Sequence, residues 1–361
     1  MLEHSESARR NRLVDDFQVG SISALLVTSP VNVRYLSGFT GSNGGLLIGA
    51  GLAVLATDGR YAEQAARETR LTDIVVTRSL VDVLVRRAAD AGVVLGVERD
   101  DLTLARFEEV TLAAGAMTVV PVSGEVEKLR RVKDDVELAA LRAAAVIADR
   151  AFATVSARLR PGVTERQIAA DLDSEMRRLG ADDIAFATIV AAGPNGSEPH
   201  HQPTDYPVVE GDLVTVDMGA LLNGYHSDMT RTVCVGAPAP WQREMYALVQ
   251  AAQLAGRAAV QAGLPAAGVD AAARQVIEAA GHGEHFVHGV GHGVGLQIHE
   301  APMLFGDSEV VLSAGMVVTV EPGVYLPGRG GVRIEDTVVV GTGEVLTKAS
   351  YDGALSVPVA V

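Results

Sequence analysis

Four acidic residues in the C-terminal half of the chain stand in, or directly beside, short apolar runs that are typical of buried strands. The runs are VTVDMG (214–219), YHSDMTRT (225–232), VTVEPGVY (318–325) and VRIEDT (332–337), and the acids are Asp217, Asp228, Glu321 and Glu335. A charged side chain at the end of a buried strand carries a large desolvation cost unless another group pairs with it. Because four converging acids repel each other, a fold that gathers them needs a cation of high charge between them.

One imidazole, that of His292 in HGVGHGVGLQIHE (288–300), completes the set. Oxygen-rich ligands with one nitrogen suit manganese, cobalt, iron or zinc, and five ligands are too many for a single catalytic zinc. They suit two divalent ions that share bridging carboxylates about 3.5–4 Å apart. An isolated Asp at a strand end is more often a turn or helix cap, but five such residues in glycine-flanked segments are poorly explained as caps.

Length and charge exclude several classes of protein. A chain of 361 residues is expected to form two domains, and a formal net charge of −15 makes it a poor candidate for binding nucleic acid. The single cysteine, Cys234, cannot form an intrachain disulfide and fits a reducing compartment. No secretory signal or long apolar stretch is evident, so we expect a cytoplasmic protein without a transmembrane helix.

The pattern along the chain indicates where the domains lie. Residues 1–125 alternate strand-like with helix-like runs, which predicts an α/β domain around a mixed sheet, with residues 31–44 as a Gly- and Ser-rich loop. Pro, Gly and a run of charges near 121–132 mark a boundary. We therefore predict one domain over 1–125 and a second over 126–361.

The second domain repeats one order of elements. Helical periodicity predicts one pair of helices at 136–159 and 161–180, with Thr164 and Gln167 forming a capping box, and a second pair at 241–263 and 266–281. Acid-bearing strands follow each pair, and VTVDMG resembles VTVEPG. This order indicates an internal duplication that brings two acids from each half to a central site.

Histidines gather in two further segments. The glycines of 288–300, which contain His288, His292 and His299, favour strand and turn over helix. The pair His200 and His201 lies in a Gly- and Pro-rich loop that precedes the first acid-bearing strand. Surface loops carry many histidines without a role, so position before that strand is what makes this pair a candidate.

The motifs together resemble a known family. TIVAAGPNGSEPHH, VTVDMGALLNGYHSDMTRT, HGVGHGVGLQIHE, GMVVTVEPGVY and GGVRIEDT are similar to the motifs of the proline-specific metallopeptidases of the pita-bread fold, the Xaa-Pro aminopeptidases and Xaa-Pro dipeptidases (prolidases). NVRYLSGFTGSNG and ATDGRYAEQA resemble the creatinase-like N-terminal domain of that family. The resemblance implies an α/β creatinase-like N-terminal domain, an internally duplicated α+β pita-bread catalytic domain and a homodimer.

The resemblance also implies a role for each metal-ligand position. Asp217 would chelate one ion, Asp228 and Glu335 would bridge both, and His292 and Glu321 would complete the shell of the other. We expect two divalent ions per chain, manganese first, with cobalt or zinc as alternatives. A hydroxide held between the ions would be the nucleophile, because divalent cations lower the pKa of bound water to about 7.

The remaining roles concern the substrate, a proline-containing peptide whose scissile amide has no hydrogen. Glu321 would act as general base, and His200 and His299 would contact the substrate and stabilise the developing oxyanion. His288 would hold the substrate near the scissile bond, and Arg333 would pair with a ligand carboxylate.

One departure from the family bears on the substrate. Dipeptidases of this family often carry an arginine four residues after the histidine at position 299, where it binds the carboxylate of a dipeptide, but Met303 stands there in this chain. We therefore predict an Xaa-Pro aminopeptidase, although an arginine such as Arg34, or one from a second subunit, could restore the ion pair. An Xaa-Pro dipeptidase is the alternative. A metal-independent creatinase-like hydrolase and a silent scaffold are disfavoured by five intact ligand positions.

Overall fold

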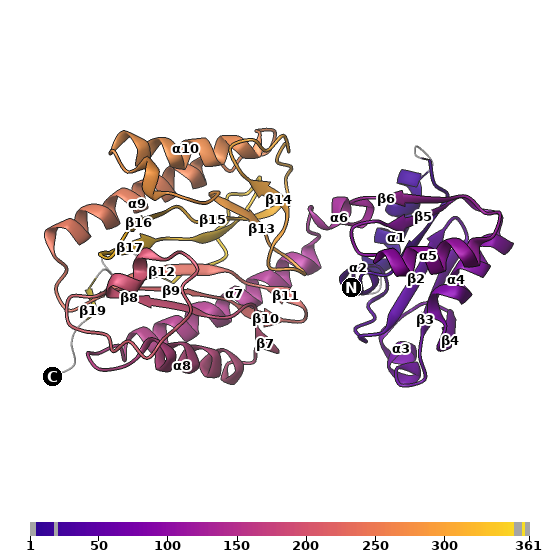
Figure 1. The fold of residues 1–361 in the computed structure, drawn as a ribbon, viewed down its shortest axis with the longest axis horizontal. Coiled ribbons are helices and arrows are strands. Elements are labelled where there is room, and N and C mark those ends of the chain that lie inside the picture. The colour runs from indigo at the N-terminus through magenta and orange to yellow at the C-terminus, as the bar shows by residue number, and fades with distance from the viewer. Residues whose placement is uncertain (1–4, 18–20, 350–355, 358–361) are drawn as a thin grey trace. The chain divides into compact units, whose positions relative to one another are not determined.

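The computed structural model describes residues 5–17, 21–349 and 356–357. The chain divides into two compact units, Met1–Arg130 and Arg131–Val361, which Figure 1 draws in indigo to magenta and in magenta to yellow. We call them the N-terminal unit and the C-terminal unit. The predicted domain boundary between residues 125 and 126 stays a prediction.

A six-stranded mixed sheet forms the centre of the N-terminal unit, as predicted. Its strand order is β4-β3-β2-β1-β5-β6, with β1 antiparallel to β2 and parallel to β5. The strands are β1 (Ala24–Val27), β2 (Gly44–Gly49), β3 (Leu52–Thr57), β4 (Asp73–Val76), β5 (Leu95–Glu98) and β6 (Val119–Val122). The helices are α1 (Ser5–Phe17), α2 (Pro30–Ser37), α3 (Ala62–Glu68), α4 (Leu80–Asp90), α5 (Leu104–Ala114) and α6 (Glu125–Arg130). Leucines and valines of the sheet pack against α4 and α5, so the apolar core lies between these layers.

The loop predicted over residues 31–44 is wrong in its first part, where α2 forms. Pro30 occupies the first turn of this helix, where its fixed φ is favourable and its missing N–H is not needed. Gly38 then ends the helix in the left-handed conformation, with φ 78° and its N–H bonded to the carbonyl of Arg34. Arg34 therefore lies on a short helix and not in a loop.

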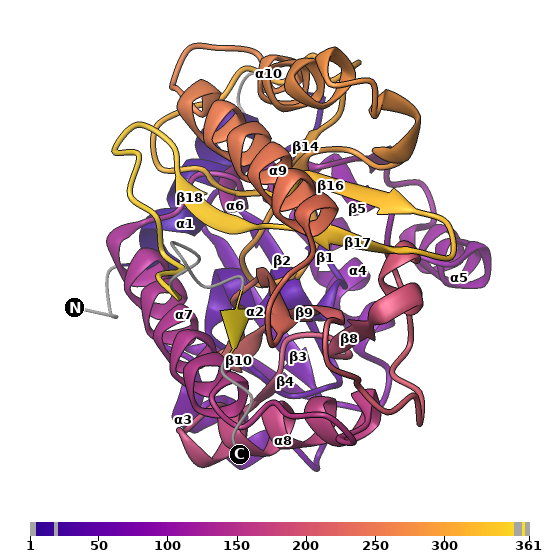
Figure 2. The same cartoon turned by 90° about the vertical axis from the view of Figure 1, so that its left-hand side faces the viewer.

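Four long helices of the C-terminal unit match the four predicted ones. They are α7 (Asp135–Ser156), α8 (Glu165–Arg178), α9 (Pro240–Ala259) and α10 (Ala266–Ala279). Thr164 accepts from the backbone N–H of Gln167 while the Gln167 side chain accepts from Thr164, so the predicted capping box is confirmed. In both Figures 1 and 2, α7 and α8 lie on one side of the strands and α9 and α10 on the other.

The described strands of this unit form two four-stranded sheets, β19-β12-β9-β8 and β14-β13-β15-β18. The second comes from the second half, and the first comes from the first half except for its edge strand β19, which lies near the C-terminus. Two smaller sheets, β11-β10-β7 and β16-β17, accompany them. The bounds are β7 (Asp183–Ile184), β8 (Ile189–Ala192), β9 (Leu213–Met218), β10 (Ala220–Leu222), β11 (Tyr225–His226), β12 (Met229–Val235), β13 (Gly291–Gly293), β14 (Glu300–Leu304), β15 (Val317–Val320), β16 (Gly323–Leu326), β17 (Gly330–Arg333), β18 (Asp336–Val339) and β19 (Ser356–Val357). Two 3-10 turns, η2 (Gly193–Ser197) and η3 (Gly283–His285), complete the unit. The predicted order of two helices followed by strands occurs twice.

Corresponding antiparallel pairs position the acids in the two halves. Asp217 on β9 lies opposite Thr230 on β12, and Val320 on β15 lies opposite Asp336 on β18. Asp228 directly precedes β12, Glu321 directly follows β15 and Glu335 directly precedes β18. The acids therefore stand at the ends of paired strands, as the sequence predicted.

Hydrogen bonds between β12 and residues 333–337 join the halves. Thr230 donates to the Glu335 carboxylate at 2.7 Å, and Thr232 donates to the carbonyl of Arg333 at 2.9 Å. The Arg231 guanidinium, almost fully buried, forms an ion pair with Asp336 at 2.8 Å. These contacts bring the acid-bearing strand ends of the first half to those of the second.

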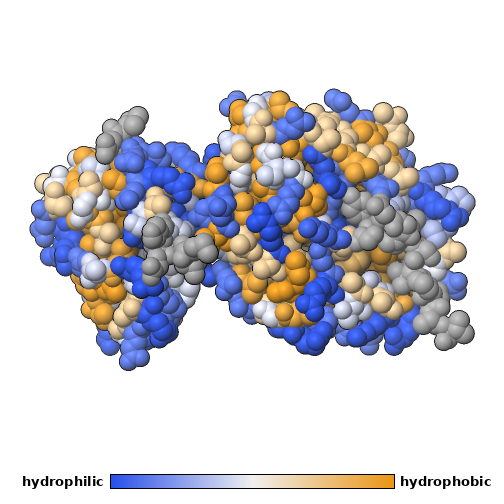
Figure 3. Space-filling view, turned by 180° about the vertical axis from the view of Figure 1, so that it is seen from behind, coloured by the Kyte–Doolittle hydropathy of each residue, from blue (hydrophilic) through white to orange (hydrophobic). Residues whose placement is uncertain are grey.

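Among the residues described, no helix is both long enough and apolar enough to cross a membrane. The face in Figure 3 carries hydrophilic and hydrophobic residues side by side.

Candidate active site

A cavity of about 550 Å³ opens between the two halves of the C-terminal unit. Its walls contain every residue predicted for the site together with several apolar side chains. The predicted residues are Asp217, Asp228, His292, Glu321, Glu335, His200, His288, His299 and Arg333. The apolar walls come from Phe186, Ile189, Ile298, Met303 and Phe305.

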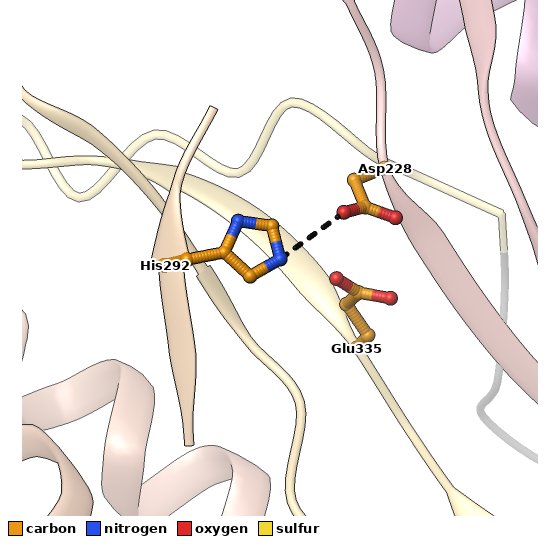
Figure 4. Close-up of side chains that lie close together, drawn as sticks. All are labelled: Asp228, His292 and Glu335. Atoms are coloured by element: carbon orange, nitrogen blue, oxygen red, sulfur yellow. Dashed lines mark ion pairs between the residues drawn. The ribbon is translucent and has the colours of Figure 1, made fainter. Parts of the chain in front are cut away.

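Asp228, His292 and Glu335 form a compact group of possible metal ligands in this cavity. Each offers one ligand atom, and these atoms all lie within 4.8 Å of one another. Figure 4 shows the three side chains converging, His292 from β13 and the two acids from the positions directly before β12 and β18, with the imidazole Nε2 facing the two carboxylates. Nε2 lies 3.5 Å from Oδ2 of Asp228 and 3.4 Å from Oε1 of Glu321.

Two local features fix the His292 ring. Its Nδ1 lies 3.0 Å from the carbonyl oxygen of Gly293, so Nδ1 carries the proton and the lone pair of Nε2 faces the acids. The backbone of β13 also lies very close to β15: a Cβ atom at Gly291 would lie only 2.1 Å from the carbonyl oxygen of Thr319. The glycines of this motif therefore allow strand contacts that a larger residue would prevent.

Asp217 is held by one of its two oxygens. Arg333 donates from Nη2 to Oδ2 at 2.8 Å, whereas Oδ1 is buried and has no hydrogen-bond partner among the residues that the structure describes. Glu335 is held in the same way: its Oε2 accepts from Thr230, while its Oε1 has no partner in the described ranges. Buried polar atoms without a partner are uncommon in folded proteins, and a bound ion is one of the ways in which such an atom is satisfied.

Burial and mutual repulsion raise the pKa values of three acids in the cavity. The pKa of Asp228 rises well above its ordinary value because of burial first and of Asp217 and Glu321 second. Burial raises the pKa of Glu321 to about 8, and it raises that of Glu335 well above the ordinary range. Burial also lowers the pKa of His292 to about 4, so this imidazole is neutral at pH 7.

A tyrosine that sequence reasoning missed connects two of the predicted residues. The hydroxyl of Tyr325 on β16 lies 2.8 Å from Nε2 of His288 and accepts from Nη1 of Arg333 at 2.9 Å. His288 is neutral because burial lowers its pKa to about 4, and its Nδ1 lies 2.8 Å from the carbonyl of Gly289. Its Nε2 therefore accepts from Tyr325, and a chain of hydrogen bonds runs from His288 through Arg333 to Asp217.

The two neighbouring histidines of the first half have different surroundings. His200 is exposed and lines the cavity. His201 is buried, and its Nε2 lies 2.9 Å from the carboxylate of Glu165 on α8, away from the cavity walls. In the second half, the exposed His299 meets the His292 ring edge-on, with 4.4 Å between ring centroids.

The cavity residues fit a divalent metal centre. Carboxylate oxygens and one neutral imidazole are the donors that manganese, cobalt, iron and zinc accept. Two of the oxygens have no partner in the described part of the chain, and three of the acids have raised pKa values that a nearby positive charge would lower. The fold and the cavity together place the chain among the metal-dependent peptidases that share the pita-bread fold.

Sequence profiles narrow this class to one family. The profile of "Metallopeptidase family M24" matches residues 139–342, and the profile of "Creatinase/Prolidase N-terminal domain" matches residues 9–132. The chain therefore belongs to metallopeptidase family M24, and the resemblance found in the sequence is confirmed.

Individual relatives extend the match over nearly the whole chain. The chain is 37% identical over 335 residues to the Xaa-Pro dipeptidase of Pyrococcus furiosus, covering 92% of this chain and 94% of the relative. The structure of an Xaa-Pro dipeptidase from Bacillus anthracis is 41% identical and superposes with a TM-score of 0.92, covering 96% and 98% of the two chains. That of an X-Pro aminopeptidase from Thermotoga maritima is 34% identical, with a TM-score of 0.89 over 97% and 100%.

Proposed function

We propose that this metallopeptidase is an Xaa-Pro aminopeptidase, which hydrolyses the bond between the first residue of a peptide and a following proline. The observation that carries the proposal is the convergence of four carboxylates and the neutral imidazole of His292 on one cavity. The relatives support the assignment of the cleaved bond, because their names specify an Xaa-Pro substrate.

Five residues would hold two divalent ions, manganese first. Asp217 would chelate one ion, Asp228 and Glu335 would bridge both, and His292 and Glu321 would complete the other shell. When bound, the ions would supply the positive charge that makes a water nucleophilic at neutral pH.

Glu321 would serve as the general base. Its Oε1 accepts from the Thr319 hydroxyl at 3.2 Å and faces the cavity, so the carboxylate is oriented before substrate arrives. Burial, with the charge of Asp217 as a smaller cause, raises the pKa of Glu321 to about 8, and the positive charge of bound ions would keep this carboxylate ionised at neutral pH. It would take a proton from the attacking water and deliver it to the leaving proline nitrogen.

The histidines would bind the substrate. His200 and His299 are exposed on the cavity wall, where an N–H of each would donate to the oxygen of the scissile carbonyl as negative charge develops. His288 would instead shape the substrate site, because both of its ring nitrogens already have partners within the protein.

The described wall of the cavity carries no Arg or Lys that is free to bind a carboxylate, which supports a peptide substrate longer than two residues. Within the described part of the C-terminal unit, Arg333 is the one Arg or Lys on the cavity wall, and it is bound to Asp217 and Tyr325. Met303 presents a thioether where an arginine would bind a dipeptide carboxylate. A substrate whose chain continues past proline brings no such charge to this wall.

Xaa-Pro dipeptidase activity is the second candidate. It is supported by relatives, since that name belongs to the Pyrococcus furiosus and Bacillus anthracis proteins. An arginine from outside the cavity, such as Arg34 on α2, would then have to bind the carboxylate. The sequence resemblance supports a homodimer, which sedimentation would test, and the single cysteine supports a reducing compartment such as the cytoplasm, which cell fractionation would test.

Hydrolysis of Ala-Pro compared with that of Ala-Pro-Ala and longer peptides, before and after chelation, tests the proposal. We expect the longer peptides to have the higher kcat/KM and chelation to abolish turnover until manganese is restored. Strict preference for Ala-Pro would establish the dipeptidase instead. Turnover that survives complete metal removal would favour the metal-independent creatinase-like alternative.

A further inference from the structure

We propose that the ion pair of Asp270 and Arg274 on α10 positions His288 at the cavity. The inference rests on the proposed function, because it assigns these two residues a part in substrate cleavage. Neither residue lines the cavity itself.

The pair is well defined on the helix. Asp270 and Arg274 are four residues apart on α10 and so share one face. Arg274 donates from Nε to Oδ2 of Asp270 at 2.8 Å and from Nη2 to Oδ1 at 2.9 Å. The Asp270 side chain is 4% exposed and that of Arg274 is 27% exposed, so solvent screens this bidentate contact only partly.

The same two side chains also bind the segment that carries His288. Arg274 donates from Nη1 to the carbonyl of Phe286 at 2.9 Å and from Nη2 to the carbonyl of His288 at 2.7 Å. Asp270 Oδ1 accepts from the backbone N–H of Val290 at 3.1 Å. Three backbone groups of residues 286–290 are thus held by one ion pair.

Phe286 adds a contact on the side chain of His288. The Arg274 guanidinium lies 4.2 Å from the centre of the Phe286 ring, a favourable cation–π distance. Phe286 in turn meets the His288 imidazole edge-on, with 5.1 Å between ring centroids and an interplanar angle of 87°. Arg274 therefore acts on both the backbone and the ring of His288.

His288 needs such support because of where it lies. Residues 286–289 belong to no helix or strand, and β13 begins only at Gly291. Yet the His288 ring lies 2.8 Å from the Tyr325 hydroxyl, and this hydroxyl also accepts a hydrogen bond from Nη1 of Arg333 at 2.9 Å. The ion pair supplies the fixed backbone that this chain of hydrogen bonds requires, and a misplacement of about 1 Å can cost about 100-fold in rate.

Only a guanidinium satisfies this geometry. Arg274 makes four hydrogen bonds in its plane while its face covers an aromatic ring. A lysine ammonium is a single point charge with three donors and cannot reproduce that planar arrangement. Arg274→Lys thus separates positioning from charge, since it retains the charge and loses the planar set of donors.

The experiment compares Arg274→Met, Arg274→Lys and Asp270→Asn with the matched control Arg178→Met. Arg178 also makes a bidentate ion pair on its own helix, with Glu175 on α8, and neither residue lines the cavity. For the three α10 variants we expect kcat/KM on Ala-Pro-Ala to fall by about 10- to 100-fold at unchanged metal content. The control should stay within about twofold of wild type.

Two further readouts distinguish positioning from a general effect on stability. In a His288→Ala background, adding Arg274→Met should lower kcat/KM by less than about a further threefold, because two changes that act through the same residue are not additive. Hydrogen exchange of residues 286–290 should accelerate in the α10 variants and not in Arg178→Met.

The inference would be overturned if Arg274→Met lowered kcat/KM equally in the presence and absence of His288. It would also be overturned if Arg274→Lys left both kcat/KM and the hydrogen exchange of residues 286–290 unaltered. A wild type that hydrolyses no Xaa-Pro peptide would instead refute the proposed function. The exchange measurement would still decide whether the ion pair holds residues 286–290.

Discussion

Arg333 holds Asp217 by one oxygen and leaves the other free. Nη2 lies 2.8 Å from Oδ2, whereas Oδ1 has no hydrogen-bond partner within the described part of the chain. The Arg333 guanidinium is itself fixed, because it also donates to the hydroxyls of Tyr325 and Thr230. It therefore fixes the position of Oδ2 of Asp217. An acid fixed in this way presents its second oxygen to the cavity without losing orientation.

Replacement of Arg333 should weaken metal binding. Arg333→Met removes the group that orients Asp217, so we expect manganese affinity to fall by about 10- to 100-fold, as measured by titration calorimetry. Arg142→Met is the control, because Arg142 also pairs with a carboxylate, that of Glu344, through two hydrogen bonds at a more exposed place. Equal affinity in the two variants would show that Asp217 does not depend on Arg333.

Replacement of Asp228 should remove metal and activity but keep the fold. Asp228→Asn retains the backbone carbonyl that accepts from Thr337 at 2.8 Å. It puts a neutral amide of the same shape in place of a buried carboxyl group whose pKa is raised well above its ordinary value. We expect less than one ion per chain by elemental analysis, loss of turnover and an unchanged circular dichroism spectrum. Turnover at the wild-type rate would contradict a bridging role for Asp228.

Stability of the chelated protein should depend on pH with a defined sign. The pKa of Glu321 rises to about 8 in the folded protein, so between pH 6.5 and 8 the folded state binds more protons than the unfolded one. The free energy of unfolding must then fall as pH rises, by about 1.4 kcal/mol per pH unit for each such group. The buried His288 and His292, with pKa values lowered to about 4, act in the opposite direction only below about pH 6.5.

The single tryptophan makes this measurable. Trp241 is the second residue of α9, so urea unfolding followed by its fluorescence reports on the C-terminal unit. Chelated wild type should lose stability from pH 6.5 to 8, and Glu321→Gln should show a smaller slope. A slope that is the same in both proteins would mean that Glu321 is not the group that titrates.

Local sequence signals predicted the elements that depend on neighbours along the chain. The capping box of Thr164 and Gln167 and the acids at strand ends are set by spacing and by burial of short apolar runs, so they could be found in advance. Helix α2 was missed because glycine and serine dominate residues 38–44, although Pro30 and Gly38 bound the helix.

Contacts between distant segments could not be predicted. Tyr325 meets His288 across 37 positions, and nothing in EPGVY indicates that its hydroxyl is part of the site. Residue patterns alone do not decide which of His200 and His201 faces the cavity, because the answer depends on Glu165, 36 residues from His201, and only the family resemblance assigned the role to His200. Arg274 and Asp270 have the spacing of an ordinary surface pair on a helix.

Substrate length should respond to the charge at position 303. Met303 lines the cavity at β14, and Met303→Arg would place a cation on a wall whose one described arginine is already paired. A bidentate guanidinium–carboxylate contact contributes about 1.5–3 kcal/mol when partly desolvated. We therefore expect the ratio of kcat/KM for Ala-Pro over Ala-Pro-Ala to rise by about 10- to 100-fold. Met303→Gln, of similar length but neutral, should leave the ratio unchanged. If both variants shift it equally, side-chain shape and not charge selects the substrate at this wall.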